Sequence, residues 1–449
     1  MDGLNAPRIK KGHGRSPSDD RRHIAILSPS TKGPLDDDGP LASTSSLRPN
    51  SPAARGKRLT SPSPAREPSV AAFEDNAQRD LAHLCRADIF RPIPTDMIPQ
   101  AFMISPHAVV EGLPVSYLIS HGHFYFAAVA SAQQLANVSD YNDTASIFQL
   151  FYNRLACLTL INKSCQDIAA MESLELRDLA GTFYRHPVTN EHLVNWDLRV
   201  LAVRLQSIGF KDWRRGIMAF YTLGQDARQE IAKARLGSKI QDEKLWRSRL
   251  LDVGIRVASM LVEMGDLDAA SRHLRTVEIE KDLDEDEKKR VSIMAALLWL
   301  QMGDLRAAKR CITPVAEEIG SEVAADISMQ VFTALVEMAE GQFATAVTAW
   351  EQLKGIHPTD AMISQNLAIC LLYTGRVTEA HQVLESAVAQ SGSVPSHSLL
   401  FNLCTIYELC SERAMELKAR LADRVAAVKP SSLGWERSAV DFKLEGVRA

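Results

Sequence analysis

A short phrase recurs four times between Trp246 and Ala427, and each copy begins with a glycine. The glycines are 38, 38 and 34 residues apart, with one alanine seven residues before each and another five residues after it. A glycine can end a helix in the left-handed conformation, and an alanine lets two helices approach closely. The phrase therefore predicts pairs of helices joined by tight turns. Its defining residues are Ala258, Gly265, Ala270, Ala296, Gly303, Ala308, Ala334, Gly341, Ala346, Ala368, Gly375 and Ala380.

The spacing resembles that of the tetratricopeptide repeat, in which helical hairpins of about 34 residues stack in series. Asp266 and Asp304 follow two of the glycines, where a carboxylate can cap the next helix by accepting backbone N–H groups. One hairpin cannot bury its apolar face alone, so at least three must stack. We therefore predict an all-α fold, an α-solenoid of tetratricopeptide-like hairpins with a disordered N-terminal tail.

The chain is predicted to have four parts. Ten of its twenty prolines precede residue 70, in a stretch with few large apolar side chains to offset the entropy of ordering. Ala202 and Gly209 repeat the seven-residue separation of the four clear copies, which predicts a degenerate hairpin in the first half. The predicted parts are a disordered, basic Ser/Pro-rich tail (1–72), an N-terminal α-helical domain with degenerate repeats (73–236), a tetratricopeptide-repeat domain (243–428) and a loose C-terminal tail (429–449).

Local patterns predict further elements within these parts. Closely spaced prolines exclude helix from residues 90–99, which we expect to be extended along a folded surface. Residues 237–242 are predicted to form a hinge between the two halves. Helices are predicted within 73–84, 113–137, 143–170, 175–180, 190–231 and 282–290, and a closing pair at 397–410 and 412–428.

The N-terminal tail carries 12 Lys/Arg against 7 Asp/Glu in residues 1–70, although the whole chain has a net charge of −4. Five serines of this tail precede a proline. They either belong to an inert spacer or are phosphorylated by proline-directed kinases, which would reverse the charge of the tail. Basic clusters at 8–11 and 55–58 suit contact with acidic lipid or an import signal. The candidate phosphorylation sites are Ser16, Ser28, Ser51, Ser61 and Ser63.

The sequence offers no chemistry that points to an enzyme. It contains no G-x-S-x-G, H-E-x-x-H, Walker or dinucleotide-binding motif, and no pattern of basic and aromatic residues that would read nucleic acid. His121 and His123 have no partner at metal spacing, so we expect ordinary packing there and no metal or cofactor. Seven scattered cysteines without a C-x-x-C motif predict free, buried thiols in a reducing cytosol. We expect no signal peptide, and no apolar run reaches about 18 residues, so membrane contact is expected only through partners.

The remaining candidate site is a docking surface. In stacked hairpins the first helices line a concave face, and counting back from each glycine places mostly apolar residues there. Such a groove suits a helix or extended segment of a stable partner, unless the chain's own helices fill it. A freestanding adaptor or co-chaperone that binds peptide segments is the alternative, although clamping a terminal carboxylate needs Lys, Arg and Asn that the groove lacks. The groove residues are Ile255, Ile293, Leu297, Leu300, Val331, Leu335, Met338, Ile369 and Leu372.

Three segments carry a resemblance to a known family. Residues 401–409 (Phe-Asn-Leu-Cys-Thr-Ile-Tyr-Glu-Leu) resemble the closing motif of the subunit-12 family of the transport protein particle (TRAPP) tethering complex. Residues 153–158 and 246–251 also resemble that family, as does the order of tail, helical middle and repeats. The likeness covers about residues 85–425.

The resemblance implies a non-catalytic scaffold subunit of the third form of the TRAPP complex, a vesicle tether and Rab exchange factor in ER-to-Golgi transport and autophagy. It implies other TRAPP subunits as partners, among them subunit 11 and others of that form, with only an indirect link to a Rab GTPase. The implied location is cytoplasmic, peripheral to ER exit sites and the early Golgi. No catalytic residue transfers from the family.

Overall fold

A computed structural model describes residues 80–94, 98–109, 112–176, 179, 181–186, 189–278, 283–319, 326–390, 392 and 394–444, apart from the side chains of 318 and 319. Within these residues every regular element is a helix, except for one antiparallel bridge between Arg185 and His192. The predicted all-α class and the stack of helical hairpins are confirmed. The predictions for the N-terminal tail, including its five serines and both basic clusters, lie outside the described residues.

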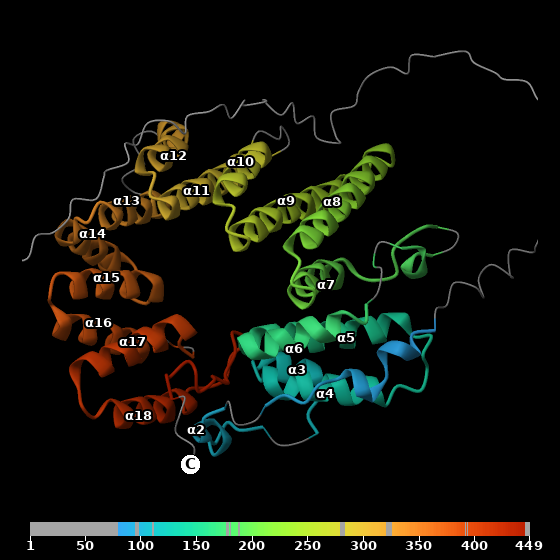
Figure 1. Cartoon of the computed structure of the whole chain (residues 1–449), viewed down its shortest axis with the longest axis horizontal. Helices are drawn as coiled ribbons and strands as arrows, with labels where there is room; N and C mark the ends of the chain where they lie inside the picture. The colour runs from blue at the N-terminus through green and yellow to red at the C-terminus, as the bar shows by residue number, and fades with distance from the viewer. Residues whose placement is uncertain are drawn as a thin grey trace, which may run out of the picture. The chain divides into compact units, whose positions relative to one another are not determined.

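The first half begins with short elements and continues with longer paired helices (Figure 1). The elements are η1 (Ala82–Leu84), η2 (Ala87–Ile89), α2 (Gln100–Met103), α3 (Val115–Ser120), α4 (Phe124–Ala136), α5 (Thr144–Ile161), α6 (Lys163–Ser173), η3 (Thr182–Tyr184), α7 (Trp196–Gly209) and α8 (Trp213–Leu236). Two helices form in each of the predicted segments 113–137, 143–170 and 190–231, although α6 and α8 continue to residues 173 and 236. Asp143 caps α5 by accepting the Ser146 N–H at 3.1 Å.

The helix predicted at 175–180 is wrong where the structure describes it. After α6 the chain turns, and Leu176 is fully buried in the core of the first half. The side-chain amide of Gln206 donates to the carbonyls of Ser173 and Leu176 at 3.0 and 2.8 Å. The Gln206 side chain on α7 therefore donates to carbonyls at the end of α6. In a longer helix, backbone N–H groups of the following turn would donate to them instead.

A buried ion pair holds α5, α6 and the extended segment together. The Arg154 guanidinium on α5 donates to both carboxylate oxygens of Glu172 on α6, at 3.0 and 2.7 Å, and both side chains are at most 2 % exposed. The same guanidinium donates to the carbonyls of Ala128 at 3.2 Å and Arg91 at 2.8 Å. Glu172 in turn accepts the backbone N–H of Arg91 at 2.9 Å. Residues 91–94 are non-helical, as predicted, and this pair fixes them on the helical surface.

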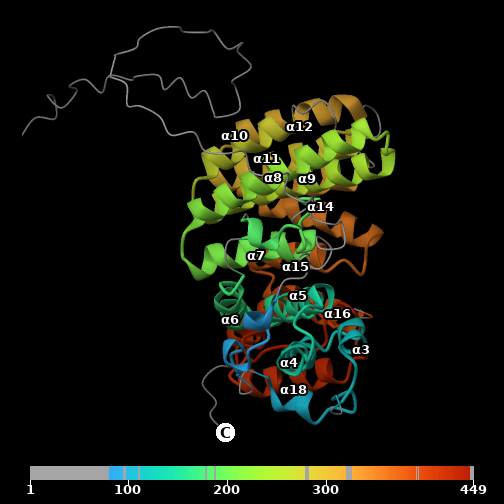
Figure 2. The ribbon, with the colours of Figure 1, turned by 90° about the vertical axis from the view of Figure 1, so that its right-hand side faces the viewer.

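The second half is a series of antiparallel helices. Its first helix, α9, runs side by side with α8 of the first half, and each of the two has 24 residues (Figure 2). Residues 237–239 of the predicted hinge form the turn between these two helices, and residues 240–242 open α9. The helices are α9 (Ile240–Glu263), α10 (Leu267–Glu278), α11 (Glu285–Met302), α12 (Leu305–Ile319), α13 (Ile327–Ala339), α14 (Phe343–Ile356), α15 (Ala361–Tyr373), α16 (Val377–Gln390), α17 (His397–Cys410) and α18 (Ala414–Ala426).

The turns within the hairpins follow the predicted chemistry. The glycines that open the four phrases, Gly265, Gly303, Gly341 and Gly375, have φ of +86°, +81°, +76° and +79°. A Cβ added at any of them would meet nothing within 4 Å, so glycine is needed there for its backbone alone. The eight alanines of the phrases are between 0 and 4 % exposed, at the helix crossings. Packing across those crossings requires small side chains.

The degenerate hairpin α7–α8 uses its glycine differently. Gly209 is the last residue of α7, and the left-handed position falls on Lys211, with φ of +55°. A Cβ on Gly209 would lie 2.9 Å from the carbonyl oxygen of Ala170 on α6. The hairpin is present where Ala202 and Gly209 predicted it, but Gly209 serves close packing between helices rather than the turn.

The segment after α18 is packed, whereas the sequence predicts a loose tail. Trp435 is 1 % exposed and Phe442 is fully buried. Both rings contact Phe102 of α2, with centroids 5.3 and 6.2 Å away, and the backbone N–H of Trp435 donates to the Gly122 carbonyl at 3.0 Å. Figure 1 shows α18 beside α2, so the end of the repeat series meets the beginning of the helical region.

Candidate interaction surfaces

The predicted groove residues lie on the first helices of the hairpins, α9, α11, α13 and α15. All nine are half-buried except Leu297, which is 40 % exposed. Val331, Leu335, Met338 and Leu372 pack against one core cluster, which brings the groove residues of α13 together with one of the two from α15. Each of these four side chains therefore has one flank in the core and another that solvent reaches.

The remaining groove residues belong to other parts of the core or to none. Ile293 and Leu300 of α11 pack against a cluster built by α11, α12 and α13, whereas Ile255 of α9 joins a separate cluster with α10. Met338 makes a contact within its own hairpin: the fully buried Trp350 of α14 donates its indole N–H to the Met338 sulfur at 3.3 Å. The most accessible of the nine is Leu297, and the use of these residues by a partner stays a prediction.

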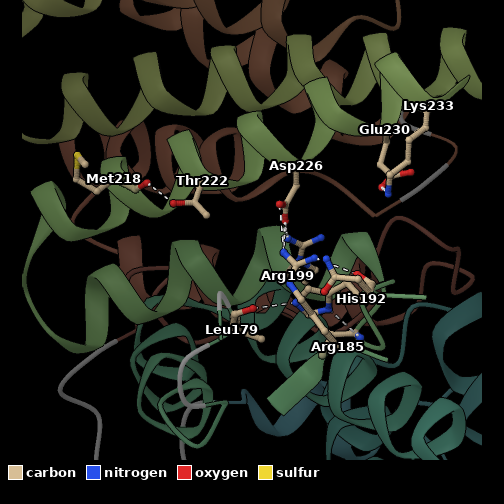
Figure 3. Close-up of polar contacts among 11 residues, drawn as sticks. Leu179, Arg185, His192, Arg199, Met218, Thr222, Asp226, Glu230 and Lys233 are labelled. Atoms are coloured by element: carbon tan, nitrogen blue, oxygen red, sulfur yellow. Dashed lines mark hydrogen bonds and ion pairs between the residues drawn. The ribbon is translucent and has the colours of Figure 1, made fainter. Parts of the chain in front are cut away.

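A polar cluster ties the loop before α7 to α8 (Figure 3). Asp226 of α8 accepts from Arg199 of α7 and from Arg185, whose guanidinium lies 3.2 Å from both carboxylate oxygens. Burial and the neighbouring Arg199 and Arg185 lower the pKa of His192 to about 4, so its ring is neutral near pH 7. His192 Nδ1 accepts the Val194 N–H at 3.1 Å, and Nε2 therefore donates to the Leu179 carbonyl at 2.8 Å.

The neutral ring of His192 predicts a loss of stability in mild acid. The unfolded chain binds a proton at His192 near pH 6.5 and the folded chain only near pH 4, so stability falls as pH drops through this window. We expect a loss in the free energy of unfolding on the order of 1–2 kcal/mol. This is less than the full pKa shift of His192 would give, because the ring is partly exposed and solvent screens its charge. Urea unfolding at stepped pH measures it. In His192→Asn, the free energy of unfolding should depend less on pH between 6.5 and 4 and should run parallel to that of the wild-type chain above pH 7. If the two curves are parallel at every pH, His192 is not the group responsible.

The predicted buried thiols are confirmed for most cysteines. Cys311 is half-buried and Cys410 is exposed. Burial raises the pKa of Cys157 and Cys404 to about 12 and that of Cys370 to about 11, which leaves almost no thiolate at neutral pH. The buried thiols are Cys85, Cys157, Cys165, Cys370 and Cys404.

Native thiol modification should therefore be fastest at Cys410, the exposed cysteine. Iodoacetamide at pH 7.5 is expected to label Cys410 at least 100-fold faster than Cys157 or Cys404, because those two have almost no reactive thiolate and no solvent access. Peptide mass spectrometry of timed samples measures the rates. All seven cysteines should react in guanidinium, and fast native labelling of Cys157 or Cys404 would show that the core is open.

The two histidines with no partner at metal spacing are part of ordinary packing, as predicted. The His121 ring stacks on Tyr117, with centroids 4.0 Å apart. His123 is 4 % exposed and lies edge-on to Trp435, with centroids 5.2 Å apart. Its Nδ1 is 3.5 Å from a carboxylate oxygen of Glu436. Sequence reasoning missed this docking of the C-terminal segment, because no local pattern connects residues 121–123 with 435–436.

No helix among the described residues has the length and apolar character that crossing a bilayer needs. No family model matches the chain. Over 309 residues the chain is 28 % identical to "Trafficking protein particle complex subunit 12" of Mus musculus, an alignment that covers 64 % of this chain and 38 % of the mouse protein. The Homo sapiens protein of the same name is 27 % identical over 310 residues, covering 64 % of this chain and 42 % of the human protein.

The chain thus spans about two fifths of the length of the curated relatives it matches. The resemblance indicated by residues 153–158, 246–251 and 401–409 is confirmed by this similarity. A tetratricopeptide repeat protein from Parabacteroides merdae superposes with a TM-score of 0.34 at 14 % identity, covering 63 % of this chain and 93 % of that one. A superposition at this score carries no weight for function.

Proposed function

We propose that this chain is a non-catalytic scaffold subunit of the trafficking protein particle (TRAPP) complex, equivalent to its subunit 12. The observation that carries the proposal is the 28 % identity to mouse subunit 12 over 309 residues. That alignment is longer than the predicted repeat domain of residues 243–428. Tandem repeats alone resemble many unrelated scaffolds, so similarity that extends beyond them favours this family in particular.

In the proposed role the chain works in the third form of the complex, which tethers vesicles and promotes nucleotide exchange on a Rab-type GTPase in ER-to-Golgi transport and autophagy. Exchange chemistry belongs to other subunits, and the chain contacts the GTPase and the membrane only through them. Its direct partners are subunit 11 and other subunits of that form, at ER exit sites and the early Golgi. Stacked hairpins with half-buried apolar side chains support a docking role, since such surfaces bind helices or extended segments.

Affinity purification of the tagged full chain from its own cells, with quantitative mass spectrometry, tests the proposal. We expect the other TRAPP subunits in amounts comparable to the chain, and recovery without them would contradict it. The alternative of a freestanding adaptor or co-chaperone predicts binding of chaperone C-terminal peptides to the purified chain. The apolar groove predicts no such binding.

The groove itself can be tested with the double variant Leu297→Asp and Leu335→Asp. A docked partner would remove water from the carboxylate that replaces each leucine, which costs free energy of binding. We therefore expect the recovery of at least one partner subunit to fall tenfold or more. Circular dichroism of the purified variant is the control. If the variant unfolds, these side chains are core and the groove assignment is wrong; if it folds and recovery is unchanged, the partner binds elsewhere.

A further inference from the structure

A cavity of about 610 Å³ lies between α12 and α13, where the second predicted hairpin meets the third. At about 30 Å³ for each water molecule, the space is equivalent to roughly 20 waters. Its volume falls in the range of clefts that hold ligands, and it opens to solvent.

The cavity arises from how the two helices diverge. Between the neighbouring hairpins the backbones of α10 and α11, and of α14 and α15, lie close together, whereas those of α12 and α13 approach at few points. Ile312 of α12 and Phe332 of α13 nevertheless belong to one core cluster. The lining residues of α13 run from Met329 to Glu340 and recur every three or four positions, so they share one face of the helix. At 1.5 Å per residue, that face is roughly 16 Å long, or about three helical turns. An elongated cleft of this length fits a short helix better than a compact small molecule.

The chemistry of the cleft combines an apolar floor with unbalanced negative charge. Its lining includes Ile312, Phe332 and Val336, which are 6 to 7 % exposed and belong to a core cluster shared by α11, α12 and α13. Among the described residues that line the cleft, the charged ones are Glu317, Glu337 and Glu340 against Lys309. Lys309 and Glu340 neutralise each other in an ion pair of 2.7 Å.

The remaining carboxylates have no cationic partner among the described residues. Glu337 also has a buried oxygen, Oε2, that accepts no hydrogen bond from them. Burying a carboxylate oxygen without a donor is costly, so an arriving cation would be favoured there. Residues 320–325, which join α12 to α13 in sequence, include no lysine or arginine and cannot supply it.

We propose that the cleft between α12 and α13 is a second docking site, separate from the groove, for a basic amphipathic helix of a protein partner. The helix inserts apolar side chains over Ile312 and Phe332 and sets a Lys or Arg against Glu317 and Glu337. Identifying that partner as another subunit of the same complex rests on the proposed function. The chemistry of the docking site is argued independently of that function.

A pair of model peptides tests the chemistry on the purified full chain. Both are helix formers of about 20 residues with leucines at i, i+3, i+4 and i+7, one flanked by lysines and its twin by glutamates. By fluorescence anisotropy we expect the lysine peptide to bind the wild-type chain at least tenfold more tightly than its twin. Equal affinities, or no binding of either, would overturn the proposal.

Thr333→Trp assigns the binding to the cleft. Thr333 is exposed and lines the cleft, so an indole there fills the space without removing any core side chain. We expect at least tenfold weaker binding of the lysine peptide, while Thr348→Trp, at an exposed position of α14 outside the cleft, leaves it unchanged. Unaltered binding to Thr333→Trp overturns the site. So does a fall in Tm of more than about 5 °C, because it would mean that the chain itself already occupies the cleft.

The same variants in cells separate this inference from the proposed function. If the wild-type chain recovers TRAPP subunits and Thr333→Trp loses at least one of them tenfold, both stand. If the lysine peptide binds the cleft but no TRAPP subunit is recovered, the proposed function fails and the docking site stands. If the subunits are recovered equally with Thr333→Trp and Thr348→Trp and the peptides do not discriminate, the docking site fails alone.

Discussion

Replacing Glu172 by glutamine is expected to lower the free energy of unfolding by about 3–5 kcal/mol. The substitution keeps the side-chain volume but leaves the buried Arg154 guanidinium without its counter-charge, since both side chains are at most 2 % exposed. It also replaces one oxygen that accepts from the Arg154 guanidinium by an amide NH₂, so that two donors face each other. The extended segment loses support as well, because Glu172 accepts the Arg91 N–H. Urea unfolding followed by circular dichroism measures the change.

An exposed pair provides the matched control. Glu416→Gln on α18 removes the partner of Arg413, the residue before that helix. The two side chains are 52 and 71 % exposed, so we expect a change within about 0.5 kcal/mol. The double variant Arg154→Met with Glu172→Leu should recover part of the loss, since it leaves no buried charge. A cost below about 1 kcal/mol for Glu172→Gln would mean that water reaches this pair.

Trp435→Ala is the second change with a large expected effect, a loss of about 3–5 kcal/mol. The indole is 1 % exposed, packs edge-on against Phe102 and His123, and donates its N–H to the Val428 carbonyl at 3.0 Å. Its removal empties a site where the C-terminal segment meets helices of the first half. Thermal unfolding should show the loss.

Two further variants test whether the loss of stability comes from the packing of Trp435 itself. Leu433 lies two positions earlier and is 74 % exposed, so Leu433→Ala should change stability by less than about 0.5 kcal/mol. Gly122→Ala should reproduce the Trp435→Ala effect from the opposite side, because an added Cβ would lie 2.1 Å from the Ser431 carbonyl oxygen and Gly122 has φ of +72°. Equal stability of Trp435→Ala and the wild-type chain would show that the segment is loose, as its sequence suggested.

Much of the repeat region follows from local chemistry. The requirement for a left-handed residue at Gly265 or Gly303 belongs to the backbone of a few residues, so a recurring glycine reveals it without the rest of the fold. The same holds for helix starts. Asp284 and Glu287 form a capping box at the beginning of α11, in the segment where the charge pattern predicted a helix start. Apolar spacing placed α17 at His397–Cys410, as observed.

The candidate docking sites were only partly predictable. The sequence locates Leu297 and Leu335 on helix faces, but their exposure depends on how closely the neighbouring hairpins stack. The cleft between α12 and α13 left no signal, because its floor residues have the same apolar spacing as residues in a closed interface. Spacing along one helix says nothing of the distance to the next.

The sequence by itself determined the helices, their turns, the repeat and the resemblance to a tethering subunit, because these depend on residues within about one repeat of each other. The tertiary structure alone decided which remote surfaces meet. It buries Trp435 and Phe442 beside Phe102, and it uses Gly209 for close packing between helices. It also sets the backbones of α12 and α13 farther apart than those of the neighbouring helix pairs. Such contacts join residues up to several hundred positions apart, and burial of apolar area selects them without a fixed spacing that could be read along the chain.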